Sequence, residues 1–193
     1  TEKIGIADNS VAIDEATGCL LELDDYYDET FRFKDPTFNL PVNVKDPDFS
    51  EEDDERIVTF GDIQNSFNSL TATLQAGGDI VSKIDMESWA KFWLVNDLVR
   101  NVETHHPKSC YIFNENPAEG EKWKFGPVWD FGSSFNRNKD RYLFEGDVWH
   151  NHWIPQICQF PAFMARVKEI WKEFYPQFNN IYTFTDEQLT LLK

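Results

Sequence analysis

The sequence predicts an α+β fold, with a small β-rich part over residues 1–58 and a mainly helical part over residues 59–193. Two observations support this division. The first 45 residues contain short apolar runs separated by turn residues, which is typical of strands. After residue 58, apolar residues recur at the three- and four-residue spacing of amphipathic helices. The chain is long enough to bury a substantial core, so we expect one domain, or one domain with a small extension.

In the β-rich part, residues 11–13, 18–23 and 40–44 are predicted strands. The acidic and aromatic segment between the last two of these, DDYYDETFRFKDPTF, is predicted to be a long loop. The acidic run EEDDE then marks a boundary before the helical part.

Two helices are predicted at the start of the helical part. Residues 60–75 have helical apolar spacing, and Gly77-Gly78 is a stop signal because glycine readily takes the left-handed conformation of a helix C-cap. Asp85 is a suitable N-cap for the second helix, with Glu87 in its first turn. Apolar side chains lie on two faces of that helix, so we expect it to be buried nearly all round. These are Met86, Trp89, Phe92, Trp93, Leu94, Val95, Val99 and Val102.

A hairpin is predicted to follow, with strands at residues 109–113 and 122–129 and a turn-rich segment between them. It ends at Asp130. A cluster of polar residues lies at the exit of the preceding helix and consists of Asn101, Glu103, His105, His106, Lys108 and Ser109. The chain thus has one carboxylate in a loop after a buried helix and another after a hairpin. This layout suits phosphoryl transfer. Buried helices followed by hairpins are also common in proteins without that function.

Three more helices are predicted near the end of the chain. A short one begins around Trp149 and Trp153, with Pro155 tolerated in its first turn. Residues 161–174 form an amphipathic helix that Pro176 is expected to end. Thr185 and Gln188 make a capping box for the last helix. The predicted core consists of Phe67, Leu70, Leu74, Trp89, Phe92, Trp93, Val95, Leu98, Val99, Tyr111, Phe125, Val128, Phe163, Val167, Ile170 and Trp171.

The net charge of −16 excludes some classes of partner. Residues 1–60 hold 17 Asp or Glu residues against 5 Lys or Arg residues, which is 12 of the 16 net negative charges. Nucleic acids and anionic membrane surfaces need a basic footprint, so we expect neither as a partner. No apolar run has the length of a membrane span, and no signal peptide is visible. A solvated acidic face is the simplest use of these charges.

Cysteine, histidine and tryptophan give weaker signals. The three cysteines have neither disulfide-framework nor zinc spacing, and two of them, Cys19 and Cys110, are expected to be small core residues. His105-His106 and His150-Asn151-His152 lack the helical offsets of zinc sites, so polar loop or core roles are preferred to a metal site. The seven tryptophans suit core packing better than a sugar-stacking platform. Glycine-rich phosphate loops and serine-nucleophile motifs are missing from the sequence.

Five stretches occur in order along the chain. They are TEKIGIADNSVAI, GCLLELDDYYDETFRF with LPVNVKDPD, IDMESWAKFWLVNDLVRNVE, KWKFGPVWDFGSSF and WHNHWIPQICQFPAFMARVKEIW. Together they resemble the spore-coat CotH kinase-like family, in the form found in secreted bacterial proteins, over its C-terminal portion. The resemblance implies the mainly helical C-lobe of an atypical protein-kinase-like fold. It also implies transfer of phosphate from ATP to protein hydroxyls with magnesium, and a secreted or cell-surface location.

The resemblance also assigns site residues by position. Asp130 would bind the metal ion, and Glu103 would stand where the family has its catalytic aspartate. Asn101, Lys108 and Ser109 would contact the cofactor, with Lys108 or Ser109 near the position of the family's metal-binding asparagine. Glutamate reaches one methylene further than aspartate, and a misplacement of that size can cost about a hundredfold in rate.

A further departure is Gly132, which stands where the family usually has a second aspartate. The resemblance places the nucleotide-gripping lobe before Thr1, so we expect the chain to be a fragment of a longer protein and to have no kinase activity alone. Two alternatives stay open: a degenerate kinase-like module that binds or scaffolds a protein substrate or surface partner, and a carbohydrate-contacting surface domain.

Overall fold

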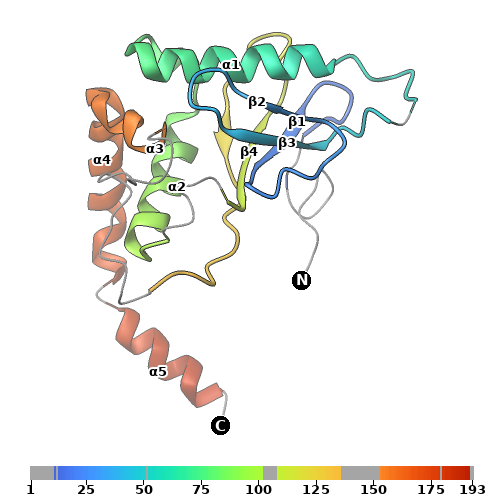
Figure 1. Cartoon of the computed structure of the whole chain (residues 1–193). Coiled ribbons are helices and arrows are strands. Elements are labelled where there is room, and N and C mark those ends of the chain that lie inside the picture. Colours follow the sequence, from blue (N-terminus) through green and yellow to red (C-terminus); the bar gives the residue numbers. More distant parts are fainter. Residues whose placement is uncertain are drawn as a thin grey trace.

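The computed structural model describes residue 11 and residues 13–50, 52–101, 108–135, 153–178 and 180–191. Within these residues it confirms an α+β fold, with strands dominating the first part and helices the second (Figure 1). In chain order the elements are β1 (Cys19–Leu23), β2 (Arg32–Lys34), β3 (Pro41–Asp46), α1 (Phe60–Ala76), η1 (Ile80–Ser82), α2 (Met86–Leu98), β4 (Cys110–Asn114), β5 (Lys124–Phe125), α3 (Trp153–Gln156), η4 (Ile157–Gln159), α4 (Pro161–Phe178) and α5 (Ile181–Leu191).

The strands form one antiparallel five-stranded sheet in the order β2-β3-β1-β4-β5. β1 lies in the middle, between β3 and β4. β1 and β3 come from the predicted β-rich part, whereas β4 and β5 come from the predicted helical part. The sheet therefore joins the two predicted parts directly.

The two faces of the sheet differ. One face packs on α1 and α2 in the main hydrophobic core, and α1 runs across the sheet in Figure 1. The other, called the second face below, carries Leu20, Glu22 and Tyr111, because side chains alternate along each strand. Leu20 and Tyr111 form a small apolar cluster there with Val11, and Trp129 packs against it.

Helix α1 begins at the predicted residue, after an N-cap that the sequence analysis did not identify, and ends at the predicted glycine stop. The Thr59 side chain accepts from the Asp62 backbone N–H at 3.1 Å, and the Asp62 carboxylate accepts from the Thr59 backbone N–H at 3.0 Å. These reciprocal bonds form a capping box. Gly77 takes φ 67° and donates to the Thr73 carbonyl, which confirms the predicted stop.

Helix α2 begins at the predicted cap, because Asp85 Oδ1 accepts from the Ser88 backbone N–H at 2.8 Å. The expectation that α2 is buried nearly all round is wrong for its second half. Val95 is 38% exposed and Leu98 is 47% exposed, because both line an open groove beside α4 and α5. Val99, which follows the helix, is only half-buried.

Two of the predictions for strands fail. The predicted long loop contains β2, which pairs with β3 at the sheet edge. β2 gives no alternating apolar pattern because only Phe33 is buried, between exposed Arg32 and Lys34. The predicted strand at residues 122–129 is only the two residues of β5. Pro127 cannot donate a ladder hydrogen bond, so the pairing stops before it.

The last two helices also differ from their predictions. Pro176 lies inside α4, which continues to Phe178, because a proline in the last turn removes only one hydrogen bond. Thr185 is not an N-cap. It lies inside α5 and donates its hydroxyl to the Ile181 carbonyl at 2.7 Å. No residue of α5 is buried, and the helix extends away from the other elements (Figure 1).

Most of the predicted core is confirmed. The buried members are Phe67, Leu70, Leu74, Trp89, Phe92, Trp93, Tyr111, Phe125, Phe163, Val167 and Ile170. Besides Val95 and Leu98, the prediction was wrong for Val128 and Trp171, which are exposed. Val128 lies beyond β5, and Trp171 lines the open groove between α2, α4 and α5. In the described residues, no helix has the length and hydropathy of a membrane span.

The weaker signals from cysteine and tryptophan are largely confirmed. Cys19 and Cys110 are buried, and all three cysteines are free thiols. Burial raises the pKa of the Cys158 thiol to about 11, so this cysteine is a poor nucleophile at neutral pH. Four tryptophans are buried in the core, which agrees with packing rather than a sugar platform for them. They are Trp89, Trp93, Trp123 and Trp153.

Candidate functional site

The chain leaves α2 through a buried pair of asparagines. Asn96, on the buried side of α2, donates its side-chain amide to the Phe92 carbonyl at 2.9 Å. Its Oδ1 accepts from Nδ2 of Asn101 at 2.9 Å, and the Asn101 backbone N–H donates to the Asn96 carbonyl at 2.8 Å. Both side chains are at most 4% exposed. Because buried amides are held by specific partners, this pair fixes the direction in which the chain leaves the helix.

The asparagine pair also contacts the segment that contains Asp130. Nδ2 of Asn101 lies 3.5 Å from the backbone carbonyl oxygen of Asp130, at the long end of hydrogen-bond distances. On the other side, the neighbouring Trp129 packs against the apolar cluster on the second face of the sheet. Asp130 is thus placed between the end of α2 and the second face of the sheet. Of the predicted site residues, Asn101 and Asp130 are brought together.

Asp130 presents an exposed carboxylate on a constrained backbone. Its φ is 51°, a left-handed conformation that non-glycine residues rarely adopt. Oδ1 accepts a hydrogen bond from the Gly132 backbone N–H at 3.1 Å. A Cβ atom at Gly132 would lie 3.2 Å from the same oxygen, so a larger residue there would press on this carboxylate. Gly132 therefore fits the turn beside Asp130. It has no side chain, so the second carboxylate that the resemblance implies is missing at this position.

The donor set around Asp130 can be compared with the needs of metal ions. Magnesium is commonly held by one or two carboxylates, with waters and substrate phosphates completing its shell. Within the part of the chain that the structure describes, no three His, Cys, Asp or Glu side chains gather into a metal cluster. A single exposed carboxylate fits an ion shared with a nucleotide. It does not fit a structural zinc site, which needs four protein ligands.

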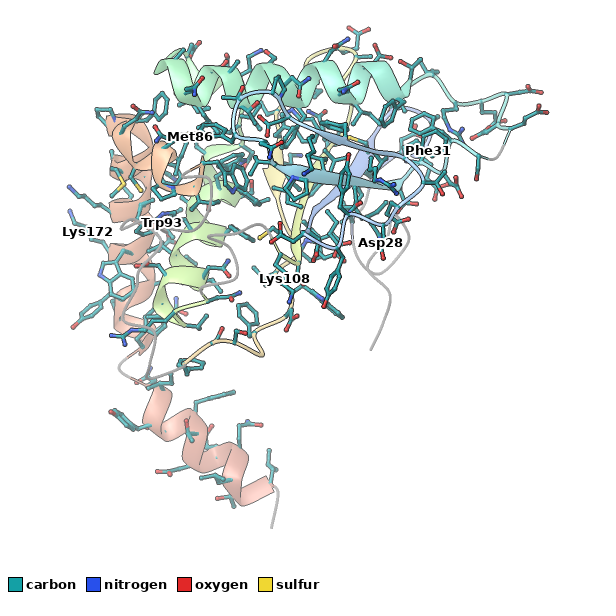
Figure 2. The ribbon with its side chains drawn as sticks, in the orientation of Figure 1. Asp28, Phe31, Met86, Trp93, Lys108 and Lys172 are labelled. Atoms are coloured by element: carbon teal, nitrogen blue, oxygen red, sulfur yellow. The ribbon has the colours of Figure 1, made fainter. Side chains whose placement is uncertain are left out.

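Lys108 and Ser109 lie where the chain enters β4, and Figure 2 shows Lys108 at this end of the sheet. The Ser109 backbone N–H donates to Asp24 Oδ2 at 2.8 Å, and Ser109 has a φ of 54°. The Lys108 Nζ lies 5.2 Å from the centroid of the Tyr26 ring, a cation–π distance. These contacts of Lys108 and Ser109 lead to the segment after β1 and not to Asp130.

The remaining predicted residues lie outside the described residues. These are Glu103, the predicted catalytic group, and the histidines of both His pairs, His105, His106, His150 and His152. Their roles stay predictions.

Among the buried polar residues that the analysis of the sequence missed, two form hydrogen bonds to predicted site residues. Asp24 is 5% exposed, although it belongs to an acidic run that suggested a solvated loop. Asn96 is 2% exposed in a helix whose buried side is otherwise apolar. A polar residue on the apolar stripe of a helix is a usable signal, because burial requires a hydrogen-bond partner. For Asp24 the sequence offers little, since the neighbouring Asp25 is exposed.

The ionised groups on the second face of the sheet form ion pairs with one another. The Lys45 ammonium lies 3.3 Å from Glu22 Oε2 and also pairs with Glu29. Burial opposes the charge of Lys45, but the hydrogen bonds and charges of the two glutamates outweigh it and raise its pKa. Burial, followed by a hydrogen bond to Glu22, raises the pKa of Tyr111 above its usual range. With two carboxylates beside it, Lys45 is largely neutralised and is a weaker anion-binding candidate than Lys108.

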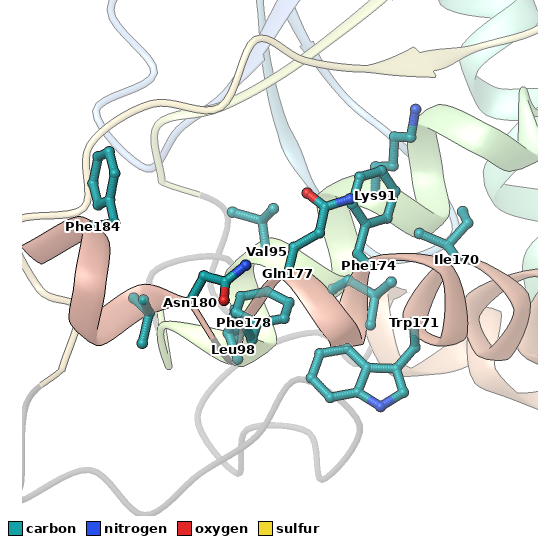
Figure 3. Close-up of a pocket in the computed structure, with 12 residues that line it drawn as sticks. Lys91, Val95, Leu98, Ile170, Trp171, Phe174, Gln177, Phe178, Asn180 and Phe184 are labelled. Atoms are coloured by element: carbon teal, nitrogen blue, oxygen red, sulfur yellow. The ribbon is translucent and has the colours of Figure 1, made fainter.

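An apolar groove of about 590 Å³ lies between α2, α4 and α5 (Figure 3). Leu94, Ile170, Phe174 and Phe178 are among its lining residues, and Lys91 is its one charged side chain. None of Asn101, Lys108, Ser109 and Asp130 lines it. A triphosphate needs several polar or cationic contacts, so this groove does not suit a nucleotide.

Comparisons with known proteins support the family and give no close relative. A family model described as CotH kinase protein matches residues 4–186, nearly the whole chain. The search of curated proteins and the search of solved structures gave no match. The α+β fold is consistent with that family. The chain belongs to the CotH kinase family.

Proposed function

We propose that this protein takes part in the transfer of a phosphoryl group from ATP to protein hydroxyls, with Asp130 as a ligand of a magnesium ion. The observation that carries the proposal is the placement of Asp130. Its carboxylate is exposed, its backbone carbonyl lies next to the buried Asn101, and its turn is closed by Gly132. Membership of the CotH kinase family supports the same assignment.

Catalysis of phosphoryl transfer depends on positioning and on stabilising negative charge. A magnesium ion held by Asp130 would supply positive charge that offsets the negative charge of the phosphates. Asp130 would hold the ion from a turn that contacts Asn101 and whose neighbouring Trp129 packs against the second face of the sheet. Lys108 would contribute an ammonium group to the phosphates, with Ser109 beside it. Glu103 would orient the acceptor hydroxyl, as the resemblance implies.

A degenerate, kinase-like module that binds a partner without chemistry is the second candidate. Gly132 favours it, because the second carboxylate that the resemblance implies is missing from the turn after Asp130. A secreted or cell-surface location is part of both proposals and rests on the family resemblance. The two candidates differ in one property that is easily measured, which is magnesium-dependent binding of ATP.

The test is a calorimetric titration of the full-length protein with ATP, in magnesium and in EDTA, because the resemblance places the lobe that grips the nucleotide outside residues 1–193. We expect saturable binding that needs magnesium and that weakens at least about tenfold, or 1.4 kcal/mol, in Asp130→Ala. Asp186→Ala is the matched control, because Asp186 lies on the exposed helix α5, away from Asn101 and Gly132. Asp186→Ala should keep the urea unfolding midpoint of the wild type, and Asp130→Ala should still unfold cooperatively with a midpoint only slightly lower, because alanine is strained at the φ of 51°.

Each other outcome removes part of the proposal. If the wild type does not bind ATP with magnesium, the kinase proposal fails and the binding-module candidate remains. If Asp130→Ala binds as tightly as the wild type, the assignment of Asp130 as the metal ligand is wrong.

A further inference from the structure

Asp24 is a buried carboxylate at the end of β1 that bonds two separate segments of the chain. It is 5% exposed. Oδ1 accepts from the Tyr26 backbone N–H at 2.8 Å, and Oδ2 accepts from the Ser109 backbone N–H at 2.8 Å. Tyr26 is two residues away, whereas Ser109 is 85 residues away. A buried carboxylate is retained only where hydrogen bonds compensate its lost hydration, and these two bonds do so.

The bond to Ser109 holds a strained backbone. Ser109 has φ 54°, a conformation that costs a non-glycine residue of the order of 1 kcal/mol and persists only where the surroundings enforce it. The carboxylate of Asp24 accepts the hydrogen bond from the Ser109 N–H. It therefore determines how the chain enters β4, and with it the direction of the preceding residue.

That preceding residue is Lys108. Its ammonium group lies 5.2 Å from the centre of the Tyr26 ring, and the backbone of Tyr26 is held by the same carboxylate. Asp24 thus fixes both partners of this cation–π contact. The neighbour Asp25 is exposed, so the two adjacent aspartates differ sharply in environment.

We propose that Asp24 is a positioning residue that sets Lys108 for contact with the phosphates of the nucleotide. This inference rests on the proposed function, because it assigns to Lys108 a phosphate of the same ATP molecule. Asp24 acts through Lys108 and touches neither nucleotide nor metal. A long lysine side chain has many rotamers, so fixing its backbone and resting its ammonium on an aromatic ring lowers the entropy lost on binding.

The test compares Asp24→Asn with the matched control Asp25→Asn. Asparagine keeps the shape of the side chain but replaces one accepting oxygen with an NH2 group and removes the charge. We expect hydrogen exchange of the Ser109 amide, measured by NMR, to accelerate at least about tenfold in Asp24→Asn, because a charge-assisted hydrogen bond is lost. Asp25→Asn should leave this exchange unchanged.

Nucleotide titrations then separate a positioning role from a purely structural one. Asp24→Asn should weaken binding of ATP with magnesium at least about tenfold, as expected for a lost charged contact, and leave binding of adenosine unchanged. In a Lys108→Met background, Asp24→Asn should cause no further loss, because Asp24 acts through the ammonium that is already missing. A purely structural role would weaken adenosine and ATP alike and would add to the effect of Lys108→Met.

A second variant covers the case in which Asp24→Asn does not fold. Asp24→Asn combined with Ser109→Gly relieves the backbone strain, because glycine adopts positive φ freely. This double variant should fold and should show the same selective loss for ATP.

Two failures can be told apart. If the wild type does not bind ATP with magnesium, the proposed function and this inference fall together. If it binds, and Asp24→Asn binds ATP as the wild type does, only the positioning role of Asp24 is overturned.

Discussion

At the scale of single residues, the polar side chains that matter most are those buried away from water. Asn96, Asn101 and Asp24 are each at most 5% exposed. Asn96 and Asn101 are hydrogen-bonded to each other, and Asn101 also contacts the Asp130 carbonyl. Asp24 accepts a hydrogen bond from the backbone of the distant Ser109. An unpaired buried polar group costs about 1–3 kcal/mol, so such residues define which segments must meet. Here they define the positions of Asp130 and Ser109.

Trp93 provides a stability test at this scale. It is 8% exposed, and Figure 2 shows it between α2 and α4. Trp93→Ala should lower the free energy of unfolding by about 3–5 kcal/mol, because a large buried ring leaves a cavity. Urea unfolding followed by circular dichroism measures this change. Trp171→Ala, at a ring that is 36% exposed, should cost about 1 kcal/mol or less. A loss below about 1 kcal/mol for Trp93→Ala would contradict its place in the core.

At the scale of elements, the ends of α1 show how local chemistry fixes a helix. Thr59 and Asp62 close the N-terminus, and Gly77 closes the C-terminus with φ 67°. Gly61 lies inside the same helix with an ordinary backbone, and an added Cβ would meet only the Thr59 hydroxyl at 3.7 Å. Two glycines of one helix therefore have opposite roles.

Their substitution by alanine should change stability in opposite directions. Gly77→Ala should destabilise by about 1 kcal/mol, because alanine is strained at positive φ although nothing lies within 4 Å of the new Cβ. Gly61→Ala should stabilise by about 0.5–1 kcal/mol, because alanine loses less conformational entropy in a helix. Unfolding free energies of the two variants, measured side by side, give the comparison. A stabilising Gly77→Ala would show that α1 ends elsewhere in solution.

The contact between α2 and α4 includes an ion pair with a defined pH dependence. Glu87 of α2 pairs with Lys91 at 2.8 Å and with Arg166 of α4. The hydrogen bonds from Lys91 and Arg166 lower the pKa of Glu87. A carboxylate with a lowered folded-state pKa stabilises the fold above its ordinary pKa, about 4.3, and this contribution is lost as the pH falls through the lowered value.

Glu87→Gln should therefore be less stable than the wild type at pH 7, and the difference should shrink as the pH falls below about 4. The effect should be small and should decrease with added salt, because the Glu87 side chain is 41% exposed. Urea unfolding across this pH range measures it. Glu169→Gln, which removes an Arg166 partner within α4 itself, is the control. A difference that stays constant with pH would mean that Glu87 acts through packing and not through its charge.

The elements also show what the sequence could and could not predict. Helix α1 was predicted from its apolar spacing and its glycine stop, and α2 from its Asp85 cap and apolar residues, which are all local signals. The two-residue β5 and the three-residue β2 were mispredicted, because the length of a strand depends on its neighbours in the sheet. The exposure of Val95 and Leu98 likewise depends on how far α4 covers α2. Around the candidate site, Asp130 was found by resemblance, whereas Asn96 and Asp24 act through contacts that the sequence does not reveal.

At the scale of the whole molecule, the sheet decides whether the chain can be divided. The prediction that the chain has two parts meeting at residue 58 comes from sequence pattern alone. In the structure, β1 lies between β3 and β4, and all five residues of β1 pair with β4. A cut at residue 58 would separate β1 from β4 and expose Leu21, Leu23 and Ile112, which are fully buried.

We therefore predict that residues 59–193 do not fold alone. Without β1, strand β4 would have only the two-residue β5 as its partner. The main core would also lose the apolar side chains that β1 contributes. The separate fragment should show no cooperative urea transition by near-ultraviolet circular dichroism. Mixing it with residues 1–58 should restore that signal, because the missing strand pairs are then supplied in trans. Cooperative unfolding of residues 59–193 alone would instead establish the helical part as an independent domain, in which β1 contributes little to the stability of the core around α2.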